Sequence, residues 1–134
     1  MLSYEAVVPD TLELLRELMK IQIFSEMRLV GGTALAMQYG HRQSVDLDFF
    51  GKLNVGTEEI DNTLKKVGSH TLFTNSENIK IYEICGVKVD FVNYRYNWID
   101  GIVEEGGLRL ASPKDIAAMK VNAIEGRGSR KDFI

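Results

Sequence analysis

Two aspartates in the first half of the chain have the types and spacing of a metal site. Asp46 and Asp48 lie in the segment Ser44–Phe50, where the intervening positions are apolar. Side chains of a strand repeat every two residues, so both carboxylates face the same way. Two carboxylates this close need a cation beside them, and Mg²⁺ prefers carboxylates together with water and phosphate oxygens. The pair therefore predicts a Mg²⁺ site, or a Mn²⁺ site, that handles a nucleoside triphosphate.

A third carboxylate could complete a site for two metal ions. Asp90 lies in the sequence KVDFV, where it alternates with apolar residues in a predicted neighbouring strand. It is the best candidate for the third ligand. An acid that faces water on an edge strand fits the same pattern, and both interpretations stay open.

Glycines and a short basic segment come just before the aspartates. Gly31 and Gly32 follow an apolar segment and precede a predicted helix. Glycine lets the backbone approach a phosphate, and a helix N-terminus offers N–H groups and a positive dipole end. Arg42 and Ser44 could bind phosphate oxygens as well. The alternatives are a simple tight turn, a solvated arginine and a serine that begins a strand.

The elements that position these residues can be predicted from apolar periodicity and from turn residues. The class is α/β (α+β), with a small mixed or antiparallel sheet flanked by helices in a single domain over residues 1–134. Predicted helices cover about Leu12–Met19, Thr33–Tyr39, Asn54 or Thr57 to Val67, and Pro113–Glu125; predicted strands are Met27–Val30, Ser44–Phe50, an antiparallel meander over Thr71–Tyr94, and Leu108–Leu110.

Composition limits the classes of function. The 134 residues include 45% hydrophobic and 26% charged residues, which is typical of a globular domain with a buried core. The net charge of -3 gives no general attraction to nucleic acid, although basic residues gather between Leu108 and Lys131. One cysteine and two histidines exclude an internal disulfide and a Cys/His zinc site. With no predicted membrane span or signal peptide, we expect a cytoplasmic protein without membrane partners.

Two sequence blocks resemble a known family. LVGGTAL at residues 29–35 and RQSVDLDFF at residues 42–50 resemble the glycine-pair and Asp-x-Asp signature of DNA polymerase β-like nucleotidyltransferases. More narrowly, they resemble the AbiEii-type nucleotidyltransferases, which include toxins of toxin–antitoxin systems and MenT-like relatives that modify tRNA. SPKDIAAMKVNAIEGRGSRKD at residues 112–132 is similar to a later helix of that family.

The resemblance implies an activity and a role for individual residues. The activity is Mg²⁺-dependent transfer of a nucleoside monophosphate from an NTP to an acceptor hydroxyl, with tRNA as a possible acceptor and an antitoxin as a possible partner. The implied metal ligands are Asp46, Asp48 and Asp90, the phosphate-facing turn is Gly31, Gly32 and Thr33, and the later site residues are Lys120, facing the triphosphate, and Asp132, supporting the site. Without the resemblance, Lys120 is an exposed helix lysine and Asp132 an acid in a first helical turn.

The family pattern continues well beyond its Lys-Asp pair, whereas this chain stops at Ile134, two residues after Asp132. A fragment, a short homologue and a chain completed by a partner are all consistent with that difference. The alternative function is a catalytically incomplete module of the same fold that binds a nucleotide or a partner.

Aromatic and basic residues follow the predicted meander. Tyr94, Arg95, Tyr96 and Trp98 could stack nucleic-acid bases beside the basic C-terminal segment. The more common interpretation is a packed strand end.

Overall fold

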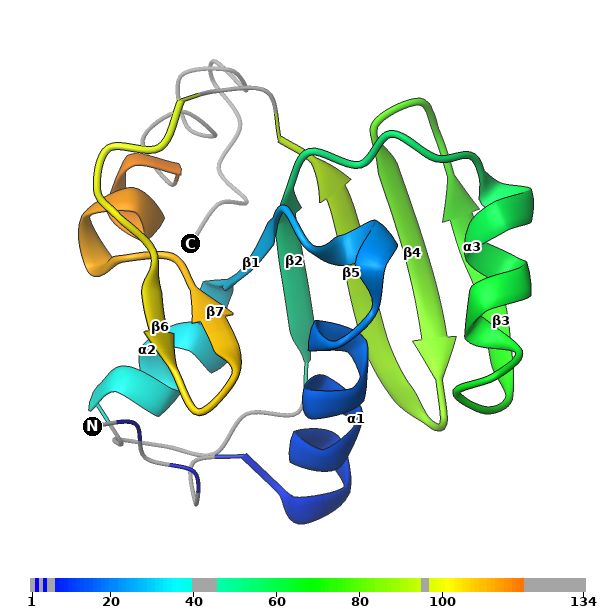
Figure 1. Ribbon diagram of the computed structural model, residues 1–134, viewed down its shortest axis with the longest axis horizontal. Coiled ribbons are helices and arrows are strands. Elements are labelled where there is room, and N and C mark those ends of the chain that lie inside the picture. The colour runs from blue at the N-terminus through cyan, green and yellow to red at the C-terminus, as the bar shows by residue number, and fades with distance from the viewer. Residues whose placement is uncertain (1, 3, 5–6, 40–45, 95–96, 120–134) are drawn as a thin grey trace, which may run out of the picture.

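The computed structural model describes residues 2, 4, 7–39, 46–94 and 97–119. A mixed 7-stranded sheet forms its centre, with strand order β3-β4-β5-β2-β1-β7-β6 (Figure 1). The strands are β1 (Met27–Val30), β2 (Leu47–Gly51), β3 (His70–Asn75), β4 (Ile79–Ile84), β5 (Val87–Asn93), β6 (Val103–Glu105) and β7 (Leu108–Leu110). The helices are α1 (Pro9–Met19), the 3-10 helix η2 (Gln22–Phe24), α2 (Gly31–Tyr39) and α3 (Thr57–Leu64), and residues 113–119 are also helical.

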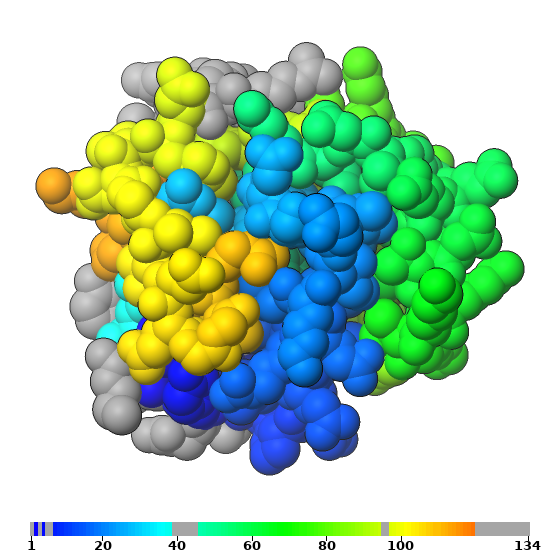
Figure 2. All heavy atoms as spheres, viewed as in Figure 1, coloured from blue at the N-terminus to red at the C-terminus, as the bar shows by residue number. Residues whose placement is uncertain are grey.

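One face of the sheet carries α1, η2 and α3, which lie in front of the strands in Figure 1. The N-terminal elements cover the middle of this face in Figure 2. Pro9 occupies the first turn of α1, where its missing N–H costs no hydrogen bond. The buried residues of α1 then recur at helical spacing and lie on one side of the helix: Thr11, Leu14, Leu15, Leu18 and Met19. The apolar side of α1 therefore faces the core.

An aromatic group occupies the core beneath these helices. Phe91 of β5 stacks on Phe24 of η2, with ring centroids 4.4 Å apart, and on Phe49 of β2, with centroids 5.5 Å apart. Tyr82 of β4 meets Phe91 edge-on at 5.9 Å. All four side chains are at most 1% exposed, and large aromatic rings contribute most of the apolar area buried in such cores. This group holds the middle strands β2 and β5 in place.

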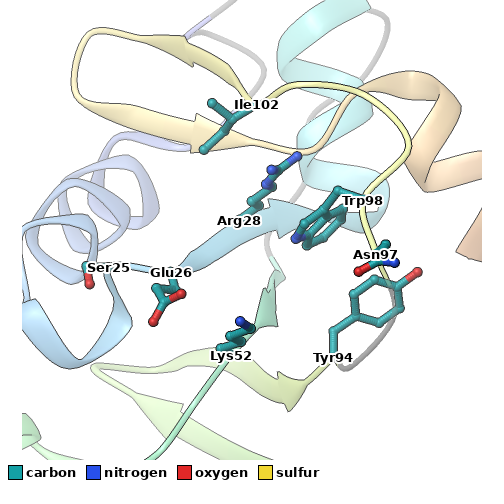
Figure 3. Close-up of a pocket in the computed structure, with 8 residues that line it drawn as sticks. All are labelled: Ser25, Glu26, Arg28, Lys52, Tyr94, Asn97, Trp98 and Ile102. Atoms are coloured by element: carbon teal, nitrogen blue, oxygen red, sulfur yellow. The ribbon is translucent and has the colours of Figure 1, made fainter.

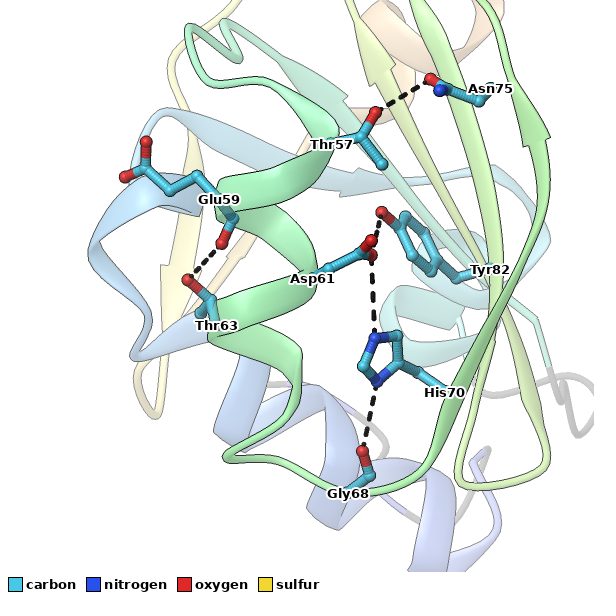
Figure 4. A network of polar contacts seen from close by, with 8 residues as sticks. All are labelled: Thr57, Glu59, Asp61, Thr63, Gly68, His70, Asn75 and Tyr82. Carbon is cyan, nitrogen blue, oxygen red and sulfur yellow. Dashed lines mark hydrogen bonds and ion pairs between the residues drawn. The ribbon is translucent and has the colours of Figure 1, made fainter.

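Polar contacts join α3 to the β3–β4 hairpin (Figure 4). The Tyr82 hydroxyl donates to Asp61 Oδ1 at 3.0 Å, and His70 Nε2 lies 3.7 Å from the same oxygen. Burial raises the pKa of Tyr82, and the hydrogen bond to Asp61 raises it further. Thr57 Oγ1 donates to Asn75 Oδ1 at 3.1 Å. These contacts lie on the helix-covered face and fix the outer part of the sheet.

The helix at residues 113–119 begins at the predicted cap. Asp115 N–H donates to Ser112 Oγ at 3.1 Å, which is the N-cap hydrogen bond, and Ser112 Oγ donates to Asp115 Oδ2 at 3.1 Å. The carboxylate of Asp115 also accepts the N–H groups of Ile99 at 2.6 Å and Asp100 at 3.0 Å. The helix start thereby anchors the loop after β5. The predicted continuation to Glu125 lies outside the described residues.

Most predicted elements are confirmed, with differences at their ends. α2 begins at Gly31, two residues before the predicted start at Thr33, so the glycine pair forms the first turn of the helix. β2 begins at Leu47, and the predicted residues before Asp46 lie outside the described part. β6 was not predicted from the turn-rich segment Asn97–Gly107; it pairs with β7 in an antiparallel hairpin whose turn contains Gly106 and Gly107, both at positive φ.

Arg109 has a structural role. Its guanidinium donates to the carbonyl oxygens of Met27 at 3.2 Å, Met19 at 3.1 Å and Phe24 at 3.0 Å. Burial lowers its pKa, and Glu104 opposes that shift. The sequence grouped Arg109 with a C-terminal basic patch, but its donors bind the backbone of α1, η2 and β1 instead of facing an external anion.

In the described part of the chain, no helix combines the length and apolar character needed to cross a bilayer.

Candidate functional site

The face of the sheet opposite α1 and α3 carries the acidic residues. Asp48 of β2 is paired in register with Asp90 of the parallel neighbour β5. The same row continues to Ile81 of β4 on one side and to Val30 of β1 on the other. Neighbouring strands lie about 4.8 Å apart, so the two carboxylates stand side by side in the middle of the sheet. The predicted meeting of Asp48 with Asp90 is therefore present in the fold.

Asp90 has an incomplete set of hydrogen bonds. Lys88 Nζ lies 3.2 Å from each carboxylate oxygen and donates a hydrogen bond to Oδ2. Oδ1 is buried and accepts no hydrogen bond within the described structure, although Lys88 lies within ion-pair distance of it. Buried carboxylate oxygens are rarely left in this state unless an ion or water completes them. The Lys88 side chain is 51% exposed and can move aside for a cation.

Asp48 is difficult to ionise in the metal-free protein. Its pKa is raised from 3.8 to about 6, chiefly by burial and then by the neighbouring charges of Asp90 and Asp46, while Lys88 opposes the shift. A divalent cation between the carboxylates would offset the repulsion that contributes to this shift. The donor set, two adjacent carboxylates with one unbonded oxygen, fits Mg²⁺ or Mn²⁺.

Gly31 brings backbone against the Asp48 carboxylate. It lies where β1 passes into α2, with φ +76°, and a Cβ built on it would come closer to Asp48 Oδ2 than real Cβ atoms come to a neighbour. Only glycine combines that φ with such a close approach at low cost. The N-terminal turn of α2, which includes Gly32, thus begins directly beside the acid pair, as a phosphate-binding turn requires.

Asp46 and Thr33 meet through the backbone. The Thr33 hydroxyl donates to the carbonyl oxygen of Asp46, and this bond ties α2 to the start of β2. Thr33 is 1% exposed, so its side chain is buried beneath the turn that begins α2. Asp46 itself is exposed. Among the described residues, no three acidic, histidine or cysteine side chains lie close enough together to hold a metal ion. The structure thus brings Asp48 and Asp90 together, and the role of Asp46 as a third ligand stays a prediction.

A cavity of about 450 Å³ opens over the acid pair. Its polar lining is Gly31, Asp48 and Asp90, and the remaining lining residues are apolar: Val30, Phe50, Ile79, Ile81, Val92, Ile116 and Met119. The last two come from the helix at residues 113–119. The sequence did not identify this apolar wall, although the alternation of β2, β4 and β5 places these side chains on the same face as the aspartates. An apolar surface of this kind beside polar groups suits a small organic ligand such as a nucleoside.

Four predicted site residues fall outside the described part of the chain: Arg42, Ser44, Lys120 and Asp132. Their roles stay predictions. The described part contains the acid pair, the glycine turn and the apolar wall.

The raised pKa of Asp48 predicts how the metal-free protein responds to pH. The pKa of the Asp48 carboxyl is about 6 in the folded protein and 3.8 ordinarily, so the folded protein binds more protons than the unfolded protein between these values. The protonated carboxyl therefore makes its full contribution to stability below about pH 4. That contribution is lost as the pH rises through about 6. We expect the free energy of unfolding in EDTA to fall on the order of 2 kcal/mol more for wild type than for Asp48→Asn between about pH 4 and pH 7. Urea unfolding at several pH values measures this difference, and equal pH profiles for the two proteins would contradict it.

Solved structures show the same fold. JHP933 from Helicobacter pylori superposes with a TM-score of 0.60 at 21% identity, covering 97% of this chain and 62% of that protein. A proposed nucleotidyltransferase from H. pylori gives a TM-score of 0.62 at 18% identity, with 96% and 63% coverage. A proposed nucleotidyltransferase from Thermotoga maritima gives 0.54 at 19% identity and covers 90% of each chain. The expected nucleotidyltransferase fold is confirmed.

Sequence comparison places the chain in a family. An uncharacterized protein of Aquifex aeolicus, aq_aa25, is 35% identical over 125 residues, which are 90% of this chain and 61% of that protein. This chain therefore spans less than two thirds of that relative's length. The sequence pattern of the AbiEii nucleotidyl transferase toxins of type IV toxin–antitoxin systems matches residues 13–134. The chain belongs to the AbiEii nucleotidyl transferase toxin family.

Proposed function

We propose that the protein transfers a nucleoside monophosphate from an NTP to an acceptor hydroxyl, with Mg²⁺ or Mn²⁺ as cofactor and pyrophosphate as the leaving group. The observation that carries this proposal is the position of Gly31, whose backbone faces the Asp48 carboxylate beside Asp90. The turn that we propose to bind phosphate and the acids that we propose to bind metal are thereby adjacent. Nucleotidyl transfer needs both at one place.

Each residue has a distinct part in the proposed reaction. Asp48 and Asp90 would hold the metal, with Asp46 as a further ligand, and the metal would supply Lewis-acid stabilisation of the phosphates and a lower pKa for the acceptor hydroxyl. Gly31 and Gly32 allow the phosphates to approach the N-terminus of α2. The apolar wall of the cavity would exclude water from one side of the bound nucleoside.

Four residues outside the described part belong to the same proposal. Arg42 and Ser44 would steady the phosphates from the connection between α2 and β2, and Lys120 would face the triphosphate. Asp132 would support the site.

The direct test is incubation of the protein with labelled NTPs, Mg²⁺ and total RNA. We expect label to enter RNA, with tRNA as the proposed acceptor, and we expect Asp46→Ala to lower this incorporation at least about a hundredfold. If no label is transferred, or if Asp46→Ala equals wild type, the proposed catalytic role of this site is wrong. Resolving the labelled RNA by size identifies the acceptor.

Family membership motivates a biological proposal as well. We infer that the protein acts as a toxin in the cytoplasm and is restrained by an antitoxin protein. Induced expression should arrest growth, and co-expression of the neighbouring gene product should relieve the arrest. An arrest that persists in Asp48→Asn would show that growth inhibition does not depend on transfer.

A further inference from the structure

Figure 3 shows the residues that line a second cavity, of about 400 Å³. Arg28 in its lining is in register with Phe50, so its side chain lies on the same side of the sheet as Asp48. The cavity collects side chains from β1, from the residue after β2 and from the loop after β5. The polar and aromatic residues that matter most are Glu26, Arg28, Lys52, Tyr94, Asn97 and Trp98. The proposed transfer reaction gives these residues no role.

Arg28 is a fixed cation in this cavity. Its guanidinium lies over the Trp98 ring, 4.3 Å from the centroid, and Nη1 donates to the carbonyl oxygen of Asp100 at 3.2 Å. Burial lowers its pKa, but an arginine remains charged in proteins. The carboxylate of Asp115 holds the loop at Ile99 and Asp100, so the backbone next to Trp98 is anchored on the core. The pocket is therefore built by contacts among its own residues.

Aromatic rings connect the two cavities. Phe50 lines the cavity over the acid pair, and its ring centroid lies 5.6 Å from that of Tyr94. Tyr94 in turn lies 4.9 Å from Trp98. Phe50 and Asp48 are two residues apart on β2, so their Cα atoms are about 7 Å apart and their side chains are neighbours on the same face. A row of rings thus leads from the reacting centre to the Arg28 cavity.

We propose that the Arg28 cavity binds an unpaired nucleotide of a single-stranded nucleic acid, which is the acceptor strand of the transfer reaction. The proposal rests on the proposed function and names its acceptor class. A base would stack against Tyr94 and Trp98, and Lys52, which is exposed, would contact a backbone phosphate. Glu26 would accept a hydrogen bond from an amino group of the base.

The chemistry of the lining favours a single strand over a duplex or a protein. Unpaired bases offer their faces for stacking, whereas paired bases in a duplex do not. Arg28 and Lys52 against Glu26 leave a local excess of one positive charge in a chain whose net charge is -3. A local excess of positive charge would attract a polyanion to this cavity although the chain as a whole does not. Its position next to the acid pair suits a strand whose terminal hydroxyl must reach that pair.

Trp98 is the single tryptophan of the chain, so its fluorescence reports the cavity directly. We would titrate the wild-type protein, in EDTA and without NTP, with single-stranded RNA and single-stranded DNA of about ten nucleotides and with the blunt duplex of the same sequence. We expect quenching by one or both single strands and weak or no quenching by the duplex. Comparison of RNA with DNA separates the two sources of the strand.

Variants identify the residues that bind. Anisotropy of a labelled strand should show at least about a tenfold weaker affinity for Trp98→Ala and close to wild-type affinity for Trp98→Phe, because one stacked base contributes about 1–3 kcal/mol. Lys52→Ala should remove about one phosphate contact. The slope of log affinity against log salt concentration should therefore fall by about one. Lys65→Ala, an exposed lysine at the end of α3, is the matched control and should bind as wild type does.

The outcomes separate this inference from the proposed function. Equal affinity for strand and duplex, or unchanged affinity in both Trp98→Ala and Lys52→Ala, overturns the inference. Strand binding in EDTA by a protein that transfers no nucleotide supports the assignment of the cavity as a single-strand site, and it contradicts both the proposed function and the role of that strand as acceptor. Transfer that proceeds without Trp98 quenching contradicts the inference alone.

Discussion

Replacing Asp48 with asparagine is expected to lower nucleotidyl transfer at least about a thousandfold while the fold is retained. Asp48 is the central acid of the site, since it is in register with Asp90 and lies against the backbone of Gly31. An amide keeps the shape of the side chain but loses the charge that holds a divalent cation. It also removes a carboxyl that burial and neighbouring acids make costly to ionise, so the metal-free variant should be at least as stable as wild type at neutral pH.

The combination of lost activity and retained stability is the informative result. Initial rates with labelled NTP and urea unfolding in EDTA measure the two quantities. Asp10→Asn is the matched control, because Asp10 is exposed in the first turn of α1 on the helix-covered face. A transfer rate in Asp48→Asn within tenfold of wild type would contradict the assignment of Asp48 as a metal ligand.

Gly31→Ala is expected to disable the site through the backbone. The new methyl group would need the space of Asp48 Oδ2, and an alanine at φ +76° costs roughly 1–2 kcal/mol by itself. Either the carboxylate or the start of α2 must move. We expect at least about a hundredfold loss of transfer, since a displacement of about 1 Å at a reacting centre has effects of that size.

Gly86→Ala separates the two causes. Gly86 has φ +83°, similar to that of Gly31, but a Cβ there would meet no atom within 4 Å. Both variants should lose similar backbone stability, and only Gly31→Ala should lose activity. Rates and unfolding free energies of the two variants give the comparison. If Gly86→Ala loses as much transfer activity as Gly31→Ala, the close approach to Asp48 is not what matters.

Much of the fold could be predicted because the elements have strong local patterns. The alternation around Phe49 and Phe91 predicted β2 and β5, and the Ser112–Asp115 cap predicted where the last described helix begins. The pairing of Asp48 with Asp90 was predicted as well, since both acids alternate with buried residues on strands expected to be neighbours. The sequence left open whether Asp90 lies on an edge strand, and the position of β5 between β4 and β2 excludes that alternative.

Other features depend on contacts between distant segments, which periodicity does not encode. Arg109 has the sequence context of a surface basic residue, yet its guanidinium binds carbonyl oxygens up to 90 residues away along the chain. The short strand β6 depends on its pairing with β7, since its 3 residues carry little apolar pattern. The Arg28 cavity likewise required β1 and the loop at Trp98 to be placed together. Their tertiary partners define these features.

Binding of Mn²⁺ in the presence of an NTP tests the central claim most directly, because it measures occupancy of the acid pair without depending on the acceptor. Electron paramagnetic resonance counts free and bound Mn²⁺ in wild type, Asp48→Asn, Asp90→Asn and the control Asp10→Asn. We predict NTP-dependent Mn²⁺ binding in wild type and Asp10→Asn, and at least about tenfold weaker binding in the Asp48 and Asp90 variants. Equal Mn²⁺ affinity in all four proteins would contradict the claim that Asp48 and Asp90 form the metal and triphosphate site.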